Sequence, residues 1–344
     1  MNNLPILAIT MGDPAGVGPE IIAMSLAQEY PYTVCRPVVI GDAKMMEKGI
    51  ASAKVALQVR PIKQVSQAQY ERGVIDVLDL NLIDPATFAY GEVQAQCGHA
   101  AFEAVRTAIE LAMKGEVDGT VTAPLNKEAL HVAGHNFAGH TEIYAHYTDT
   151  KKYAMLLADD KMRVIHVSTH VSLREACDRA KKERVIAVTE LILEACKSFG
   201  IANPKIGIAG LNPHSGEGGL FGDEEIREII PAIEEMQARG WNVEGPVPPD
   251  SLFSRARSGQ FDGCVAMYHD QGHIAFKVGG FEWDRETQRM VAVKGVNITL
   301  GLPIIRVSVD HGTAFDVAGK GIANPDALLM SIEYAALMAK NRKK

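Results

Sequence analysis

Three histidines, each at the end of a separate apolar run, constrain the fold of this chain more than any other feature. His170 ends the motif STH, His214 ends NPH and His269 lies in YHDQG. The apolar runs before them are typical of buried strands and cover residues 162–168, 205–210 and 263–267. Histidines so far apart in sequence meet only if one sheet brings the carboxyl ends of these strands to the same edge. The pattern therefore predicts neighbouring strands with a functional site at their ends.

Convergent imidazoles suit a divalent transition metal. Asp250, in the segment GPVPPD, adds a candidate oxygen ligand, and Asp270 is a candidate partner that orients the imidazole of His269. A single histidine at a strand end is more often a hydrogen-bonded structural residue than a ligand, but three in similar settings favour the metal. His166 lies inside a predicted strand and is expected in the core. His273, which follows HDQG, either lines the site or packs against its neighbours.

The composition is that of a soluble globular protein with two domains. Of 344 residues, 47% are hydrophobic and 22% are charged, which is ordinary for a packed protein. The formal net charge of −7, with no basic run before residues 340–344, argues against a nucleic-acid-binding protein. Five scattered cysteines without a CxxC pair favour a reducing cytoplasm. No apolar stretch is long enough to span a bilayer, and residues 4–9 are expected to form a core strand, not a signal peptide.

Predicted strands and helices alternate along the chain. Further strands are expected at residues 5–10, 37–41, 74–78 and 117–122. Helices are expected at residues 18–28, 93–114, 182–199, 223–239, 251–258 and 325–339. This alternation predicts an α/β fold with mostly parallel strands and helices on both faces. Because no repeat or flexible linker interrupts the pattern, the domains are expected to be interwoven.

Two glycine-containing loops open predicted helices. MGDPAGVGPE, residues 11–20, allows a close approach of the backbone but lacks the GxGxxG pattern of dinucleotide-binding loops. A tight turn explains it as well as a ligand site does. In GHTE, Thr141 is a candidate helix cap, and His140 with the helix amides is a candidate phosphate site. A plain cap and an anion site are equally compatible with this motif.

The stretch HGTAFDVAGKGIANPDALLMSI, residues 311–332, resembles the adenosine-binding loop of isocitrate and 3-isopropylmalate dehydrogenases. The resemblance implies that NAD is the cofactor. The implied contacts are His311, Gly312, Thr313 and Ala314 on the adenosine side, Asp316 on the ribose hydroxyls and Asn324 on the adenine. A carboxylate at Asp316 accepts hydrogen bonds from a ribose diol and repels a 2′-phosphate, which favours NAD over NADP. A glycine-rich turn before a helix is the alternative, and the length of the match argues against it.

The whole chain resembles the 4-hydroxythreonine-4-phosphate dehydrogenase (PdxA) family. The motifs MGDPAGVGPE, TAPLNK, GHTE, STH, NPHSGEGG, GPVPPD, MYHDQG, GVNITLGLPIIR and DHGTA occur in family order and cover nearly all of the sequence. The resemblance implies a two-domain α/β/α fold of the isocitrate/isopropylmalate dehydrogenase-like type, with the active site in the interdomain cleft. We expect a discontinuous first domain, residues 1–125 with 305–344. Residues 126–304 are expected to form a second domain that carries most metal ligands.

Site residues follow from the matching motifs. The resemblance implies the metal ligands His170, His214 and His269, with Asp250 entering the site of the neighbouring subunit in a homodimer. Zinc suits this set, and cobalt, manganese and magnesium stay open. The implied substrate contacts are His140, Thr141, Lys277, Asn297 and Arg306. Lys277 and Arg306 are cations suited to a phosphate or carboxylate, and Lys127 and Asp270 are candidates for the general base.

The resemblance implies a cytoplasmic NAD- and metal-dependent dehydrogenase of a small phosphorylated hydroxy acid, without nucleic-acid or membrane partners. Oxidation at C3 and loss of CO2 would convert 4-phospho-D-threonate or 4-phospho-D-erythronate into dihydroxyacetone phosphate. TAPLNKEALHVAGHN, HDQGHIAFK and DHGTAFD resemble this branch more than the alternative, the 4-phosphohydroxy-L-threonine dehydrogenase of pyridoxal phosphate biosynthesis. A metal-dependent hydrolase or aldolase is a weaker alternative, because hydrolysis has no use for NAD. A non-catalytic sugar-phosphate binder is another.

One segment departs from the family pattern. Residues 281–294, FEWDRETQRMVAVK, are longer than the usual link between Lys277 and the GVNIT motif. Polar turn-forming residues between two more apolar arms predict a β-hairpin. Its place between Lys277 and Asn297 would let it reshape the substrate pocket or the dimer contact.

Overall fold

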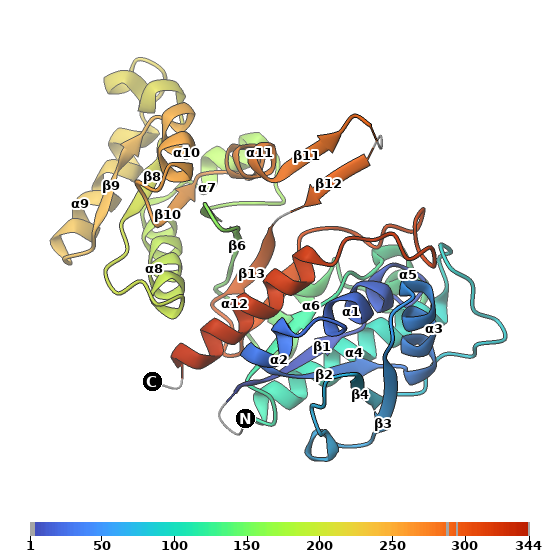
Figure 1. Cartoon of the computed structure of the whole chain (residues 1–344). Coiled ribbons are helices and arrows are strands. Elements are labelled where there is room, and N and C mark those ends of the chain that lie inside the picture. Colours follow the sequence, from blue (N-terminus) through green and yellow to red (C-terminus); the bar gives the residue numbers. More distant parts are fainter. Residues whose placement is uncertain (1–3, 287–288, 294, 343–344) are drawn as a thin grey trace. The chain divides into compact units, whose positions relative to one another are not determined.

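The computed structural model describes residues 4–286, 289–293 and 295–342, and the chain forms two compact units. The terminal unit combines Met1–Tyr153 with Ala292–Lys344, and the central unit is Ala154–Val291. In each unit, helices pack on a sheet whose strands are mostly parallel (Figure 1). The predicted α/β fold is confirmed.

The sheet of the terminal unit has the strand order β3-β4-β2-β1-β5-β14-β13. Its strands are β1 (Ile6–Thr10), β2 (Arg36–Gly41), β3 (Gln58–Ile62), β4 (Val74–Asp79), β5 (Gly119–Thr122), β13 (Val296–Leu300) and β14 (Arg306–Val309). Neighbouring strands are parallel except β13 and β14, which run antiparallel with Asn297 opposite Ser308. β5 and β14 are buried at every position, as expected for central strands covered on both faces.

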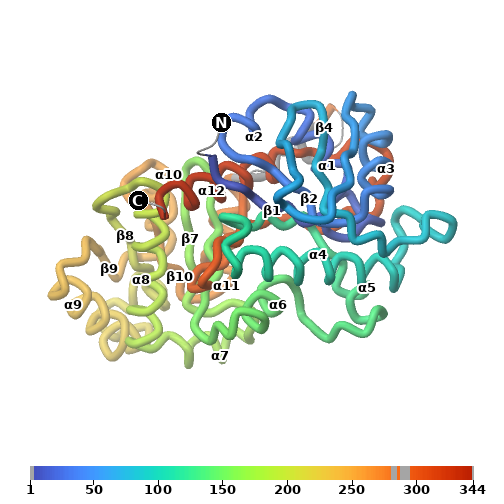
Figure 2. Tube along the Cα trace, turned by 90° about the horizontal axis from the view of Figure 1, so that it is seen from below, coloured from blue at the N-terminus to red at the C-terminus, as the bar shows by residue number. Residues whose placement is uncertain are grey.

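Helices cover this sheet. They are α1 (Gly18–Leu26), α2 (Tyr30–Val34), α3 (Ala43–Ala53), α4 (Ala95–Met113), α5 (Lys127–Val132), α6 (His140–Tyr147) and α12 (Asp326–Arg342), with a 3₁₀ turn at Val65–Gln67. α1 and α3 lie side by side (Figures 1 and 2). The reason is Gly49 of α3, where an added Cβ would lie 2.6 Å from the Cβ of Pro19. Only a residue without a side chain allows this approach.

The boundaries of the units differ from the expected ones at 125/126 and 304/305. Residues 126–153 belong to the terminal unit because Leu130 of α5 and Tyr144 of α6 share one buried cluster with Phe102 of α4. The hydroxyl of Tyr144 also donates a hydrogen bond to Thr120 Oγ1 in β5, at 2.9 Å. β13 joins the same unit through its pairing with β14. Local sequence patterns do not reveal such packing partners.

The sheet of the central unit has the order β6-β7-β10-β8-β9. Its strands are β6 (Ala154–Ala158), β7 (Arg163–His166), β8 (Ile206–Ala209), β9 (Val243–Val247) and β10 (Gly263–Ala266). Only β6 and β7 are antiparallel. The helices are α7 (Leu173–Arg179), α8 (Lys182–Ser198), α9 (Ile230–Ala238), α10 (Pro249–Arg257) and α11 (His269–Gly280), with a 3₁₀-type turn at Pro213–Gly219. Leu252, Phe261 and Phe276 lie in the core of this unit.

The hairpin predicted in the 281–294 segment is confirmed. β11 (Phe281–Asp284) and β12 (Arg289–Val293) form a two-stranded sheet of their own (Figure 1). Residues 287–288 and Lys294 lie outside the described residues.

Several elements differ from the sequence-based expectation, and two of them have a clear physical reason. The helix expected at residues 223–239 begins as a π turn, Glu225–Ile229, and continues as α9. Pro231 has no backbone N–H to bond the carbonyl of Arg227, which favours the wider turn. β9 was not among the expected strands; its sequence VEGPV contains Gly245 and Pro246, which are uncommon inside strands.

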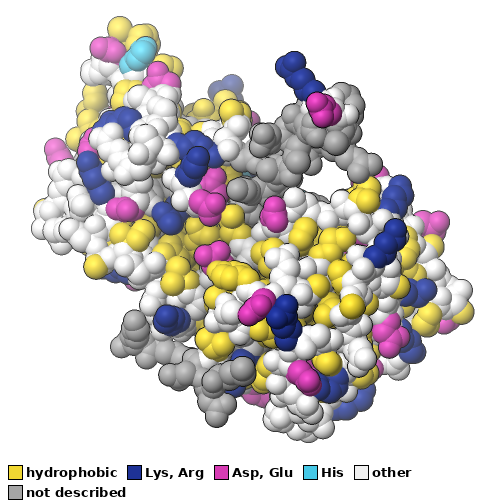
Figure 3. Space-filling model, in the orientation of Figure 1, with side chains coloured by type: hydrophobic (Ala, Val, Ile, Leu, Met, Phe, Trp, Pro, Cys, Tyr) yellow, Lys and Arg dark blue, Asp and Glu magenta, His cyan; other side chains and the backbone are white. Residues whose placement is uncertain are grey.

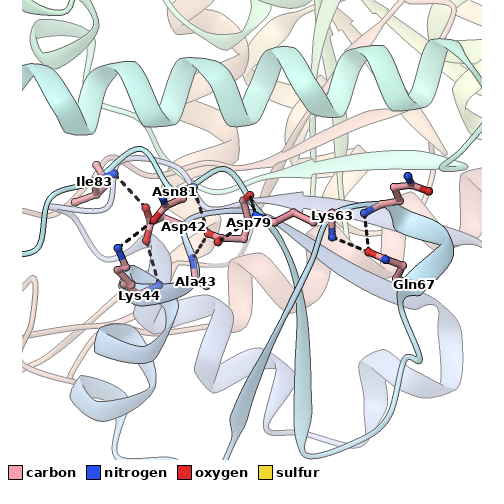
Figure 4. A network of polar contacts seen from close by, with 9 residues as sticks. Asp42, Ala43, Lys44, Lys63, Gln67, Asp79, Asn81 and Ile83 are labelled. Carbon is pink, nitrogen blue, oxygen red and sulfur yellow. Dashed lines mark hydrogen bonds and ion pairs between the residues drawn. The ribbon is translucent and has the colours of Figure 1, made fainter.

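Two aspartates hold the loops that follow β2 and β4 (Figure 4). Asp42, the N-cap of α3, accepts hydrogen bonds from Lys44 N at 3.0 Å and from Ile83 N at 3.1 Å. Asp79 accepts one from Ala43 N at 3.0 Å. These hydrogen bonds satisfy backbone N–H groups that have no acceptor within the helix or the loops.

The surface carries both signs of charge. On the face shown in Figure 3, Lys and Arg side chains are interspersed with Asp and Glu side chains, in keeping with a net charge of −7. Within the described residues, no helix combines the length and the apolar character that crossing a bilayer requires.

Candidate active site

β10 lies between β7 and β8, and the three strands are parallel. Their carboxyl ends therefore share one edge of the sheet, and one of the three histidines follows each end. His170 comes shortly after β7, and His269 is the first residue of α11 after β10. The ring centroids of His170 and His269 are 6.0 Å apart. Both residues line a cavity of about 430 Å³ together with Asp270 and Tyr268.

Asp270 gives His269 the setting of a metal ligand. Its Oδ1 lies 2.7 Å from His269 Nδ1, so the carboxylate accepts a hydrogen bond from this nitrogen. A proton on Nδ1 leaves the lone pair of Nε2 for a metal. The side chain of His269 is 39% exposed, so a ligand can reach it. The chemistry of this donor set fits a divalent cation.

Two further histidines pack against His269. The ring of His273 stacks on it with centroids 3.7 Å apart, and His273 Nδ1 lies 3.1 Å from His166 Nε2. His166 is buried, as expected, and burial followed by the charge of His273 lowers its pKa to about 3, so its ring is neutral. Of the two alternatives for His273, these contacts support packing.

The other two candidate ligands lie apart from this pair. His214 is exposed, and residues 214–218 all have positive φ angles. Asp250, in the first turn of α10, lines a second cavity of about 350 Å³ with Asp270 and Tyr268. Among the described residues, no three His, Cys, Asp or Glu side chains lie close enough to hold one ion. The structure therefore brings together two of the four expected ligands.

Sequence reasoning missed the residue that holds the turn of His214. Glu225 is 1% exposed, and its Oε1 accepts hydrogen bonds from Leu211 N and Asn212 N, both at 2.7 Å. Its Oε2 accepts another from Asn212 Nδ2 at 2.8 Å. A glutamate in an apparent surface helix carries no sequence signal for this role.

Arg306, the first residue of β14, is 3% exposed. Its Nη1 donates to Thr299 Oγ1 at 2.8 Å and its Nη2 to Thr122 Oγ1 at 3.1 Å. Among the described residues, Arg306 forms no ion pair. Its Nε is buried and has no hydrogen-bond partner in the same part of the chain. Burial lowers the pKa of Arg306 to about 10, so it remains a cation at neutral pH.

His140 lies close enough to Arg306 to sense its charge. Burial, and after it the positive charge of Arg306, holds the pKa of His140 well below its usual range, so the ring is neutral. Its Nε2 is buried and has no hydrogen-bond partner within the described part of the chain. Of the two alternatives for GHTE, the Thr141 cap is wrong: the N-cap of α6 is Gly139, and no side-chain hydrogen bond of this N-cap occurs among the described residues. The first amides of α6 therefore remain available to an anion.

The remaining expected substrate and base residues lie in both units. Lys127 lies next to the start of α6, since its Cε is 3.7 Å from a Cβ added to Gly139. Asn297 is on β13, and the half-buried Lys277 is on α11 of the central unit. The threonines that hold Arg306 were missed. Thr122 opens the TAPLNK motif and Thr299 lies in GVNITLGLPIIR, but a threonine in a strand is ordinarily just a strand former.

The 311–325 loop, which precedes α12, is exposed at Gly312, Ala314 and Asp316. The space beside Gly312 is open, since an added Cβ would meet no heavy atom within 4 Å, and Asp316 is exposed. Ala314 has a positive φ of 46°, which marks a sharply bent backbone. Asn324 has a structural role beside the expected adenine contact, because its Oδ1 accepts a hydrogen bond from Asp326 N at 2.7 Å.

Of the two explanations for MGDPAGVGPE, the structure supports the tight turn. Residues 11–22 are all buried. A Cβ added to Gly12 would lie 2.3 Å from Pro124 O, and one added to Gly18 would lie 2.2 Å from Met11 O. The glycines therefore let the backbone approach other parts of the chain.

Comparison with known proteins decides the family. The profile of the family described as pyridoxal phosphate biosynthetic protein PdxA matches residues 33–335. This chain belongs to the PdxA family. A protein of Oceanobacillus iheyensis, provisionally named D-threonate 4-phosphate dehydrogenase, is 50% identical over 341 residues, covering 98% of this chain and 99% of that protein. The D-threonate 4-phosphate dehydrogenase of Cupriavidus necator is 47% identical over 340 residues, 98% of each chain.

Solved structures agree with this placement. A 4-hydroxythreonine-4-phosphate dehydrogenase from Klebsiella pneumoniae shares 45% of its sequence with this PdxA family member, with a TM-score of 0.86. The match covers 98% of this chain and 99% of that one. The predicted family and the predicted dehydrogenase class are confirmed.

Proposed function

We propose that this PdxA family member oxidises the C3 hydroxyl of a 4-phosphorylated four-carbon hydroxy acid with NAD, and that the product then loses CO2. The substrate is 4-phospho-D-threonate or 4-phospho-D-erythronate, and the final product is dihydroxyacetone phosphate. Two relatives matched over nearly their full length carry the name D-threonate 4-phosphate dehydrogenase, which supports this substrate class.

The observation that carries the proposal is the buried guanidinium of Arg306. A cation removed from water destabilises the fold unless an opposite charge compensates it. The two Nη groups are held by threonine hydroxyls, and Nε is left for a ligand. A phosphate or carboxylate matches the planar donors of arginine. The site is therefore suited to an anionic group of the substrate.

The other substrate-binding residues have complementary roles in the proposal. Neutral His140, Thr141 and the free amides at the start of α6 bind oxygens of the phosphate beside Arg306. Lys277 and Asn297 bind the carboxylate and a hydroxyl. Substrates that lack the phosphate would leave the buried Nε of Arg306 without an acceptor, which disfavours their binding.

The chain's own residues also prepare the chemistry. His170, His214 and His269 would hold one divalent cation together with Asp250 of a second copy of the chain, and this cation would supply positive charge that eases proton loss from the C3 hydroxyl. NAD, bound along the 311–325 loop through Asp316 and its neighbours, supplies the hydride acceptor. Asp270 keeps the proton of His269 on Nδ1. Lys127, which lies next to the start of α6, and Asp270 are the candidates for accepting the substrate proton.

Asp250 is proposed to serve the site of a second copy of the chain. It lines a different cavity from His170 and His269, which fits a role outside its own site. Co-expression of Asp250→Ala with His170→Ala tests this. If Asp250 acts in the partner subunit, mixed dimers contain one intact site and recover activity. If it acts in its own subunit, every site of a mixed dimer lacks one ligand and no activity returns.

The direct test is NADH formation by metal-supplemented enzyme offered three substrates side by side. We expect 4-phospho-D-threonate or 4-phospho-D-erythronate to have the highest kcat/KM. A second candidate, 4-phosphohydroxy-L-threonine, is favoured by the name of the Klebsiella pneumoniae enzyme. Preference for this amino acid would overturn the proposed substrate, and no NADH with any of the three would overturn the proposed reaction.

A further inference from the structure

Glu20 joins two segments at opposite ends of the chain. It lies in the first turn of α1 and is fully buried. One carboxylate oxygen accepts a hydrogen bond from Gly319 N, and the other accepts one from Gly321 N at 3.0 Å. Both glycines belong to the 311–325 loop, so one buried charge binds two amides of the segment that bears Asp316.

The 311–325 loop also packs closely against neighbouring segments of the terminal unit. Gly319 and Gly321 both have positive φ angles, 77° and 67°. A Cβ at Gly319 would lie 2.6 Å from the ring of Tyr90, and one at Gly321 would lie 2.0 Å from Ser52 O. A residue with a side chain at either position would force the loop or its neighbours to shift. The hydrogen bonds to Glu20 therefore act on a loop with one well-defined position.

A second contact holds the beginning of the same loop. Val17 N, one turn before Glu20, donates to Thr313 O at 3.0 Å. A Cβ at Gly16 would lie 2.7 Å from the same carbonyl oxygen. The tight turn of the first loop thus holds residue 313, and Glu20 holds residues 319 and 321. Asp316 lies between the two attachments.

The charge of Glu20 is compensated by these amides. The ion pairs that the described residues form do not include Glu20. Burial raises its pKa, and the bonds from Gly319 and Gly321 act in the opposite direction. Hydrogen bonds from N–H groups to a carboxylate are about twice as strong as neutral ones. If Glu20 were lost, the two amides would lose their acceptor.

We propose that Glu20 is the positioning residue of the cofactor site: it holds the 311–325 loop in the conformation that binds the adenosine part of NAD. The inference rests on the proposed function, which places NAD on this loop. A loop held in its binding conformation before the ligand arrives does not have to be ordered during binding. Glu20 therefore contributes to affinity for NAD without touching it.

The experiment compares Glu20→Gln and Glu20→Ala with a matched control, Asp76→Asn. Asp76 is also buried in the terminal unit and also accepts two backbone hydrogen bonds, from Gln69 N at 2.9 Å and Tyr70 N at 2.7 Å. Its loop is not the one proposed to bind NAD. The two readouts are amide hydrogen exchange of residues 311–325 without NAD, and the Kd for NAD by calorimetry.

We expect both Glu20 variants to speed exchange of the 311–325 loop and to weaken NAD binding, about tenfold for Glu20→Ala and less for Glu20→Gln. Glutamine keeps the shape and one acceptor oxygen, so it should also remain folded where alanine does not. Asp76→Asn should change neither quantity. Unchanged exchange in both Glu20 variants would overturn the inference.

One further outcome separates this inference from the proposed function. Faster exchange with an unchanged Kd would also overturn the positioning role. The variant Asp316→Ala then decides what else has failed. If it weakens NAD binding, only the role of Glu20 is wrong. If it leaves the Kd unchanged, the assignment of NAD to this loop is wrong as well.

Discussion

The residues proposed to bind an anion in the terminal unit and those proposed to bind a metal in the central unit differ in how far the protein itself holds them in place. Arg306 is buried and donates two hydrogen bonds to threonine hydroxyls. By contrast, His214 and Asp250 are exposed, and His170 and His269 line an open cavity. The difference follows from position: Arg306 starts a strand with neighbours on both sides, whereas the ligands lie on segments beyond strand ends.

The comparison shows which interactions hold the side chains of each proposed site in place. The terminal unit holds a charge in place with its own hydrogen bonds before any ligand arrives, at a cost in stability. In the central unit, the free energy of metal binding would include the cost of arranging exposed side chains. Substitutions should therefore affect stability and ligand binding in different proportions in the two units.

The largest effect is expected for His214→Ala. Loss of a ligand should abolish metal binding and lower turnover at least about a thousandfold, because several kcal/mol of charge stabilisation would be lost. The thermal unfolding temperature without metal should stay within a few degrees, because His214 is exposed. Metal content by elemental analysis and NADH formation check this. His131→Ala, also exposed, is the control, and full activity of His214→Ala would remove His214 from the metal site.

Arg306→Met should separate binding from stability in the terminal unit. We expect kcat/KM to fall roughly a hundredfold, from the loss of charge-assisted hydrogen bonds. The free energy of unfolding without substrate should be unchanged or higher by about 1 kcal/mol, because a buried cation is removed. Urea unfolding with and without inorganic phosphate measures both. Phosphate should stabilise the wild type and Arg306→Lys more than Arg306→Met; equal stabilisation of all three would contradict an anion site at Arg306.

Asp316→Ala tests the 311–325 loop with a smaller effect. The KM for NAD should rise about tenfold, which corresponds to loss of a hydrogen bond to a charged group. The KM for the phosphorylated acid should not change, which serves as the internal control. Equal changes in both constants would argue for a general disturbance of the unit.

Asp13→Asn is expected to have the smallest effect on activity. It tests how much stability the terminal unit loses by burying a charged group. Burial raises the pKa of Asp13 from 3.8 to about 6, and its Oδ2 has no hydrogen-bond partner in the described residues. Between pH 4 and 6 the folded protein then binds more protons than the unfolded chain, so this group's contribution to stability falls as the pH rises. The variant should be more stable at pH 7 by on the order of 1 to 3 kcal/mol.

The control for this prediction lies in the pH profile. Below pH 4, where Asp13 is protonated in both states, Asp13→Asn and the wild type should unfold at the same urea concentration. A stability difference that does not vary with pH would contradict the raised pKa. Glu20, from the same first loop, has hydrogen bonds to both oxygens, and these bonds oppose the rise in its pKa that burial causes.

Much of the fold and part of the site follow from the sequence alone. Apolar runs located the strands before His170, His214 and His269, because buried strands need continuous apolar sequence. The partners of the site residues were not predictable. Thr122 and Thr299 reach Arg306 only because distant strands are adjacent in the sheet. Local patterns carry no information on such pairings, and the same reason explains the misplaced unit boundaries.

The turn that contains His214 shows a second reason why the site could not be fully predicted from the sequence. Residues 214–218 adopt positive φ angles although His214, Ser215 and Glu217 are not glycines. Such residues avoid this conformation unless the surrounding structure imposes it. The bonds from Leu211 and Asn212 to Glu225 are part of that surrounding structure.

The position of β14 has a consequence for synthesis of the chain on the ribosome. β14 lies between β5 and β13, and Thr120 bonds a carbonyl 185 residues further along the chain. The edge of β5 that faces β14 therefore stays unpaired until the last tenth of the protein has been made. Exposed strand edges recruit other chains. Nascent chains of this protein thus carry an open strand edge through most of translation, and Arg306, which pairs with Thr120 when that edge closes, is also the arginine proposed to bind the anion.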